Sequence, residues 1–165
     1  TSTGGDGIFK QDIDSGERRQ MRFSDSEYPR LSIRQLHLAP QSDQVFYMLQ
    51  GEPAIYRLNL DTRVEFEVLS VAEGERLITF GINEATDRLL WLIQKNEALS
   101  LYVDNLSDPG NPVEIALPDD IPADIRPLGG LMQVMFSSDG NTAIIGGFSN
   151  IDNPENILLK ITFDG

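Results

Sequence analysis

Four segments of this chain repeat one pattern of apolar and polar residues. They occupy residues 8–14, 55–61, 101–107 and 158–164, and their starts lie 47, 46 and 57 positions apart. A period of this size, built from strand-like units, is typical of proteins that repeat one β-sheet motif along the chain. The repeat limits the fold more than any other feature, because each copy has to form the same supersecondary unit.

A second repeated unit precedes the last three of these segments. It consists of two apolar triplets joined by a polar turn, at residues 36–47, 80–91 and 134–145. In each copy, seven positions separate the last residue of the first triplet from the first residue of the second. Two apolar strands around a short polar turn indicate a β-hairpin. We name its strands A and B, and we name the first repeated segment strand C.

Strand C alternates apolar and polar residues, which is the period-two pattern of a half-buried strand. A weaker apolar segment, strand D, follows it at residues 19–23, 64–69 and 113–117. The order along the chain is therefore C-D, A-B-C-D, A-B-C-D, A-B-C. It predicts an all-β fold of antiparallel sheets, with about three and a half four-stranded units. The proline-rich residues 118–127 are predicted to be a loop.

Two short motifs resemble those of the β-propeller superfamily. Residues 136–141 read F-S-S-D-G-N, close to the F-S-P-D-G-K hairpin of TolB-like, WD-repeat-like and lactonase-like propellers, and residues 55–61 are close to their I-Y-x-x-D-L-D strand. The resemblance covers nearly the whole chain from Ile8 onward. It implies propeller blades and leaves the activity open. True WD repeats carry a Trp-Asp dipeptide, whereas Trp91 is followed by Leu92. A β-sandwich with a fortuitous repeat is the alternative.

The repeat also sets the expected domain organisation. Residues 1–7, rich in Gly, Ser and Thr, are predicted to be a flexible tract, and residues 8–165 one propeller-like domain. Propellers have about four to eight blades, so three and a half blades with strand C at both ends predict an incomplete ring. We expect the remainder of a longer propeller, or a second copy in a homo-oligomer, to cover the unpaired strand edges.

Charge and composition narrow the class of partner. The net charge of −13 disfavours nucleic acid and anionic membrane surfaces. There is no cysteine, which excludes disulfides and thiolate metal sites. No apolar run is long enough to span a bilayer. The Gly-rich first residues are similar to the tract after the lipidated cysteine of exported bacterial lipoproteins, although that cysteine is absent here. The similarity favours a periplasmic or extracellular location, lipid-anchored or free.

No catalytic motif stands out, and no catalytic residue is predicted. His37, the one histidine, lies within strand A and is expected on a sheet surface rather than as a base or metal ligand. Thr1 could act as an N-terminal nucleophile only if the surrounding structure held it in place, and a Gly-rich tract is not expected to do that. Metal binding remains as the chemistry to consider.

Two oxygen-rich loops are weak calcium candidates. Asp12 and Asp14 lie in the first, beside Ser15 and Glu17, and Asp152 and Glu155 lie in the second, among several Asn residues. Ca²⁺ takes about six to eight oxygen ligands, often from such loops. Neither spacing fits the helix–loop–helix calcium motif, and turns favour the same residue types. Calcium is the one cofactor that the sequence suggests. The alternative for Asp14 is a structural role as a turn residue.

The sequence favours a non-catalytic binding or scaffolding module that contacts a protein partner in an exported or surface assembly. The alternative is part of a calcium-dependent propeller enzyme, such as a lactonase-like hydrolase, whose ligands would come from several blades. A rise in melting temperature on addition of calcium would favour the enzyme.

Overall fold

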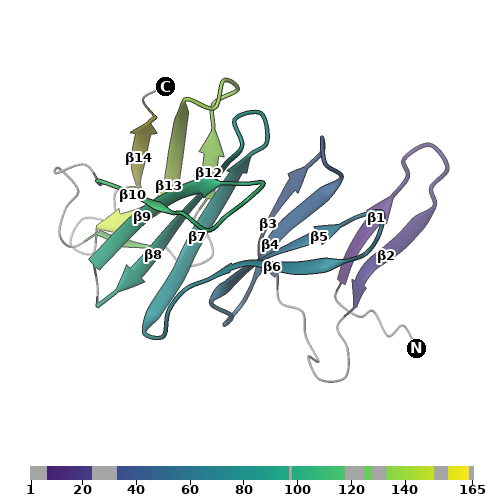
Figure 1. The fold of residues 1–165 in the computed structure, drawn as a ribbon, viewed down its shortest axis with the longest axis horizontal. Coiled ribbons are helices and arrows are strands. Elements are labelled where there is room, and N and C mark those ends of the chain that lie inside the picture. The colour runs from purple at the N-terminus through teal and green to yellow at the C-terminus, as the bar shows by residue number, and fades with distance from the viewer. Residues whose placement is uncertain are drawn as a thin grey trace. The chain divides into compact units, whose positions relative to one another are not determined.

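The computed structural model describes residues 7–23, 33–96, 98–117, 125–127, 133–150 and 156–163 (Figure 1). These residues form β-strands and turns, and no helix among them could cross a membrane. The chain divides into two compact units, residues 1–68 and 69–165. Each unit is described by itself below.

The first unit contains two antiparallel sheets. Sheet 1 is a hairpin of two strands, β1 (Gly7–Gln11) and β2 (Arg18–Phe23). Sheet 2 has the order β3-β4-β5-β6, in which each strand pairs with its neighbour along the chain. Its strands are β3 (Ile33–Ala39), β4 (Gln44–Leu49), β5 (Ala54–Asn59) and β6 (Glu65–Ser70). The predicted orders C-D and A-B-C-D are therefore confirmed for sheets 1 and 2.

The second unit contains sheets 3 and 4. Sheet 3 repeats the A-B-C-D order with β7 (Glu75–Asn83), β8 (Arg88–Lys95), β9 (Ala98–Asn105) and β10 (Val113–Ile115). Sheet 4 places strands A, B and C as β12 (Gln133–Phe136), β13 (Thr142–Asn150) and β14 (Asn156–Thr162). The all-β prediction is thus confirmed.

A short strand corrects one prediction. β11 (Ile125–Pro127) pairs with the last three residues of β13, inside the segment expected to be a loop. Proline lacks a backbone N–H and therefore fits only where a strand has a free edge. β11 has such an edge, because β13 is its one partner among the described strands.

One hydrogen bond recurs in three sheets and explains why the repeat is so regular. The residue just before strand B uses its carbonyl oxygen to accept the N–H of the residue just after strand C. The pairs are Leu60 to Asp43 at 2.9 Å, Leu106 to Asp87 at 3.0 Å and Phe163 to Asn141 at 2.9 Å. We call this contact the turn latch. It ties the A–B turn to the end of strand C and so fixes the register of the sheet.

The two units have separate apolar cores. In the first unit, Ile8 and Met21 from sheet 1 pack on the face of sheet 2 that carries Val45, Tyr47 and Leu58. In the second unit, sheets 3 and 4 pack face to face through nine buried residues: Ile78, Leu90, Leu92, Leu101, Val134, Ala143, Ile145, Leu159 and Ile161. Sheet 4 therefore covers one face of sheet 3 in the way that sheet 1 covers part of sheet 2.

The approach of β7 to β12 is close. A Cβ atom added to Gly81 would lie 2.5 Å from Cγ1 of Val134, so only glycine fits there without a shift. Strand A of sheet 3 consequently lies directly against strand A of sheet 4.

The repeat predicts that Leu38, Ile82 and Phe136 occupy equivalent buried positions, and it predicts the same for Ile13, Leu60, Leu106 and Phe163. This prediction is correct in register and partly wrong in burial. Leu38, Ile82 and Phe136 each pair with the second residue of strand B, as expected. However, Leu38 is 57% exposed, and Ile13 is 94% exposed although its counterpart Leu60 is buried. The repeat determines strand register, but burial also depends on which sheet lies opposite, and that differs from copy to copy.

Candidate functional site

The first unit contains a pocket beside sheet 1 and the turn that follows β5. Its volume is about 460 Å³. The lining residues come from the two ends of the β1–β2 turn and from the C–D turn of sheet 2: Lys10, Gln11, Asp12, Ile13, Glu17, Arg19, Met21, Leu60, Asp61 and Arg63.

The pocket has an apolar base and a charged rim. Met21 and Leu60 are buried and belong to the core of the first unit. Ile13 is 94% exposed and presents an apolar side chain to solvent at the rim. An apolar centre ringed by polar groups is the usual anatomy of a protein-recognition surface.

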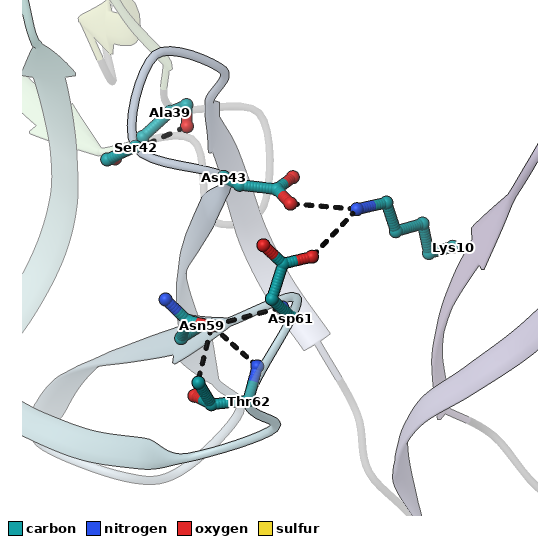
Figure 2. A network of polar contacts seen from close by, with 7 residues as sticks. All are labelled: Lys10, Ala39, Ser42, Asp43, Asn59, Asp61 and Thr62. Carbon is teal, nitrogen blue, oxygen red and sulfur yellow. Dashed lines mark hydrogen bonds and ion pairs between the residues drawn. The ribbon is translucent and has the colours of Figure 1, made fainter.

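Lys10 connects the rim to sheet 2. Its Nζ lies 2.8 Å from Oδ2 of Asp43 and 3.5 Å from Oδ1 of Asp61, as Figure 2 shows. The hydrogen bond to Asp43 raises the pKa of Lys10, and the same bond holds the pKa of Asp43 below its ordinary value. All three side chains are well exposed to solvent, so the network keeps its charges and is weakened by salt.

Asp12, one of the calcium candidates, has a structural role. Its Oδ1 accepts the backbone N–H of Ser15 at 2.7 Å and the Ser15 hydroxyl at 2.8 Å. These bonds hold the pKa of Asp12 below its ordinary value. Asn59, 47 residues later, makes the same two contacts with Thr62, at 2.7 and 3.0 Å. Asp12 and Asn59 are therefore equivalent residues that organise the C–D turn.

The structure brings the first calcium loop together only in part. Asp14 lies in the exposed turn after β1, and Glu17 accepts a hydrogen bond from Nε of Arg19 at 2.9 Å, which lowers the pKa of Glu17. Within the described ranges, no three His, Asp or Glu side chains lie where they could hold a metal ion. Asp152 and Glu155 lie outside the described residues. Calcium binding thus stays a prediction.

Arg63 supplies a cation to the rim. Its backbone has a left-handed φ of 61°, and its N–H donates to the carbonyl of Asn59 at 3.0 Å. The turn therefore fixes the direction in which the Arg63 side chain leaves sheet 2. No ion pair to Arg63 occurs among the residues that the structure describes.

Of the two residues considered for catalysis, the structure describes His37, which does not line the pocket. His37 is half-buried on β3, and its Nε2 lies 2.8 Å from the amide nitrogen of Gln35. Thr1 lies outside the described residues.

Sequence reasoning missed the link between Lys10 and Asp43, because the two residues are 33 positions apart and no spacing rule joins them. It could have found the turn role of Asp12. The signal was the alignment of Asp12 and Ser15 with Asn59 and Thr62 at the repeat spacing.

No protein-family model and no curated protein matches the sequence. Several solved structures are similar to it. TolB from Acinetobacter baumannii aligns with a TM-score of 0.56 and 15% identity, over 99% of this chain and 39% of its own. A chain of the nidogen/laminin complex aligns with a TM-score of 0.59 and 13% identity, over 95% of this chain and 57% of its own.

An oligogalacturonate lyase in complex with manganese aligns with a TM-score of 0.57 and 14% identity, over 89% of this chain and 40% of its own. This chain thus spans between 39% and 57% of the length of these three structures. At such low identities the likeness concerns the fold alone. All three are propeller-type folds, and the four sheets of this chain have the antiparallel order of propeller blades. The chain has a propeller-type fold.

Proposed function

We propose that this protein is a non-catalytic binding module that recognises a protein partner through the pocket beside sheet 1. The observation that carries the proposal is the rim residue Ile13, 94% exposed above the buried side chains of Met21 and Leu60. The free energy falls when a partner covers a large apolar side chain that is exposed to water, so such a side chain favours binding.

Side-chain hydrogen bonds and an ion pair organise the turns around the pocket. Asp12 and Asn59 organise the two turns that border the pocket, and Lys10 on β1 contacts Asp43 and Asp61 of sheet 2. A site whose loops are already ordered loses less conformational entropy on binding. The pocket is therefore suited to an exposed peptide segment or loop of a folded partner.

The charges on the rim define the chemistry of that segment. Lys10 and Arg19 have carboxylate partners within the protein, whereas Arg63 has no ion pair in the described part of the chain. A guanidinium of this kind binds a carboxylate with two parallel hydrogen bonds. We expect the partner to place an apolar side chain against Ile13 and an Asp, Glu or C-terminal carboxylate at Arg63.

The experiment uses the full chain with a photo-crosslinking amino acid at position 13, in the cells that make the protein. A matched control carries the crosslinker at Val113, which is 61% exposed in the other unit. We expect a crosslinked protein at position 13 that is absent at position 113. That protein, once purified, should bind the Arg63→Glu variant at least about tenfold more weakly, a loss of about 1.4 kcal/mol. The Arg76→Glu variant makes the same change of charge on sheet 3 and should bind normally.

The same crosslinks at both positions, or equal affinity for both Arg variants, would overturn the proposal. A calcium-dependent hydrolase activity that is lost in Asp12→Asn would also overturn it, in favour of the enzyme alternative. The proposal includes a periplasmic or extracellular location, for which the Gly-rich first residues are the support. Cell fractionation tests the location separately.

A further inference from the structure

Strand β1 has an edge that none of the described strands occupies. In sheets 2 and 3, strand C (β5 and β9) pairs with strand B on one side and strand D on the other. β1 corresponds to strand C, and it pairs with the D strand β2 alone. Its other edge therefore presents backbone donors and acceptors in the place where strand B lies in the later sheets.

The residue after β1 also lacks, among the described residues, the turn-latch hydrogen bond of the later sheets. Ile13 stands at the repeat position of Leu60 and Leu106, which are 8% and 6% exposed and whose N–H groups donate to the turn latch. Ile13 is 94% exposed, and its N–H has no backbone acceptor among the described residues. In sheets 2, 3 and 4 the accepting carbonyl belongs to the A–B turn, and no described A–B turn lies at Ile13.

A third observation comes from strand A of sheet 2. Leu36 and Leu38 on β3 are 46% and 57% exposed. Their counterparts in sheet 4, Val134 and Phe136, have the same register against strand B. Val134 is only 4% exposed, because strand A of the preceding sheet lies against it at Gly81. Leu36 and Leu38 lie where strand A of sheet 1 would cover them.

We propose that the free edge of β1 and the exposed leucines of β3 form a docking surface for one β-hairpin of the A–B type. Its second strand would pair antiparallel with β1, as β4 pairs with β5 and β8 with β9. Its first strand would cover Leu36 and Leu38. The residue before its second strand would be Asp or Asn, with its carbonyl accepting the N–H of Ile13, as in the other three sheets.

The occupant is a hairpin from another polypeptide segment rather than a second copy of these residues. Each A–B hairpin within the described residues is already paired with its own strand C, in sheets 2, 3 and 4. A second copy would have to open one of its own sheets in order to donate a hairpin. The inference goes beyond the proposed function, because it concerns the edge of β1 rather than recognition at Arg63.

The test adds a hairpin peptide to the full chain and follows backbone amide exchange by NMR. The probe is a cyclised peptide with the sequence of residues 33–49, the chain's own A–B hairpin, and its scrambled version is the control. We expect exchange in β1 and at Ile13 to slow by at least about tenfold, because new hydrogen bonds protect those amides. The scrambled peptide should change nothing.

Two variants locate the site. Leu36→Lys combined with Leu38→Lys should weaken peptide binding by at least about tenfold, because two charges then face the peptide's apolar strand. Leu38→Lys alone provides the same test if the double variant does not fold. Met135→Lys, 58% exposed on strand A of sheet 4, is the matched control and should bind the peptide normally.

Three outcomes would overturn the inference. The first is the absence of slowed exchange in β1 at the highest soluble peptide concentration. The second is equal binding by the Leu36/Leu38 and Met135 variants. The third is protection of β1 in the chain alone that rises with protein concentration, which would make a second copy the occupant. None of these results bears on the difference in binding between the Arg63 and Arg76 variants, so failure here is distinguishable from failure of the proposed function.

Discussion

Among single residues, Gly81 and the Lys10–Asp43 pair act between neighbouring sheets rather than within one sheet. Gly81 lets strand A of sheet 3 lie against strand A of sheet 4, and Lys10 reaches from sheet 1 to a turn of sheet 2. Neither role can be derived from the sequence repeat, because each depends on a residue in the next copy. A repeat describes one sheet, whereas these residues act between two.

Gly81→Ala should destabilise the protein by about 1–3 kcal/mol, because its Cβ would overlap the buried side chain of Val134. Urea unfolding measures the change. Gly146→Ala is the matched control in sheet 4: its Cβ would lie 3.1 Å from the end of the exposed Leu158 side chain, which can move aside. A loss as large for Gly146→Ala as for Gly81→Ala would contradict the close packing of β7 on β12.

The Lys10–Asp43 pair predicts a stability that depends on pH. The folded state lowers the pKa of Asp43, so its contribution is present above the unfolded-state pKa, about 4, and is lost as the pH falls through the folded value. Asp43→Asn should therefore lower the urea midpoint at pH 7 and make no difference near about pH 2. High salt should reduce the difference at pH 7. Asp14→Asn makes the same charge change in an exposed turn and should show neither effect.

At the scale of strands and turns, the repeat predicted the topology well. The A-B-C-D order and the register of A against B are confirmed in sheets 2 and 3. Strand ends differ from the prediction by a few residues, as for β10, which ends at Ile115 rather than at residue 117. The exception is β11, where prolines concealed an edge strand. Period-two patterns identify strands that are half-buried, and a three-residue edge strand is too short to show one.

The side chain of Asn59 stabilises the C–D turn of sheet 2. The Oδ1 atom of Asn59 accepts three hydrogen bonds, from Asp61, Thr62 N–H and the Thr62 hydroxyl. Asn59→Ala should cost about 1 kcal/mol of stability, since the turn loses these bonds to solvent. Asn59→Asp should restore most of it, because Asp12 performs the same role in the first turn. Equal losses in both variants would show that the turn does not depend on this oxygen.

At the scale of the whole molecule, burial follows from which faces are covered. Leu101 and Leu158 occupy the same position of strand C, yet Leu101 is fully buried and Leu158 is 67% exposed. Sheet 4 covers Leu101, whereas Leu158 lies on the face of sheet 4 turned away from that core. Sequence alone could not separate them, because both residues are leucines in the same pattern. The candidate pocket was unpredictable for the same reason, since it forms where two copies meet.

The same substitution at Leu101 and at Leu158 measures this difference in burial. Leu101→Ala should destabilise by about 2–5 kcal/mol through lost burial and a cavity. Leu158→Ala should change stability by less than about 0.5 kcal/mol, as is usual at exposed sites. Urea unfolding of the two variants under the same conditions gives both values. Similar losses at the two positions would mean that the outer face of sheet 4 is covered in solution.

The chain is a series of like sheets, in which sheets 2, 3 and 4 are each closed by a turn latch and sheet 1 has no A–B hairpin among the described residues. Amide hydrogen exchange of the isolated chain, residue by residue, tests this arrangement most directly. We expect the N–H groups of Leu60, Leu106 and Phe163 to be protected, because each donates to its turn carbonyl, and the N–H of Ile13 to exchange at the rate of an open backbone. Protection of Ile13 equal to that of the other three, or rapid exchange at all four, would contradict it.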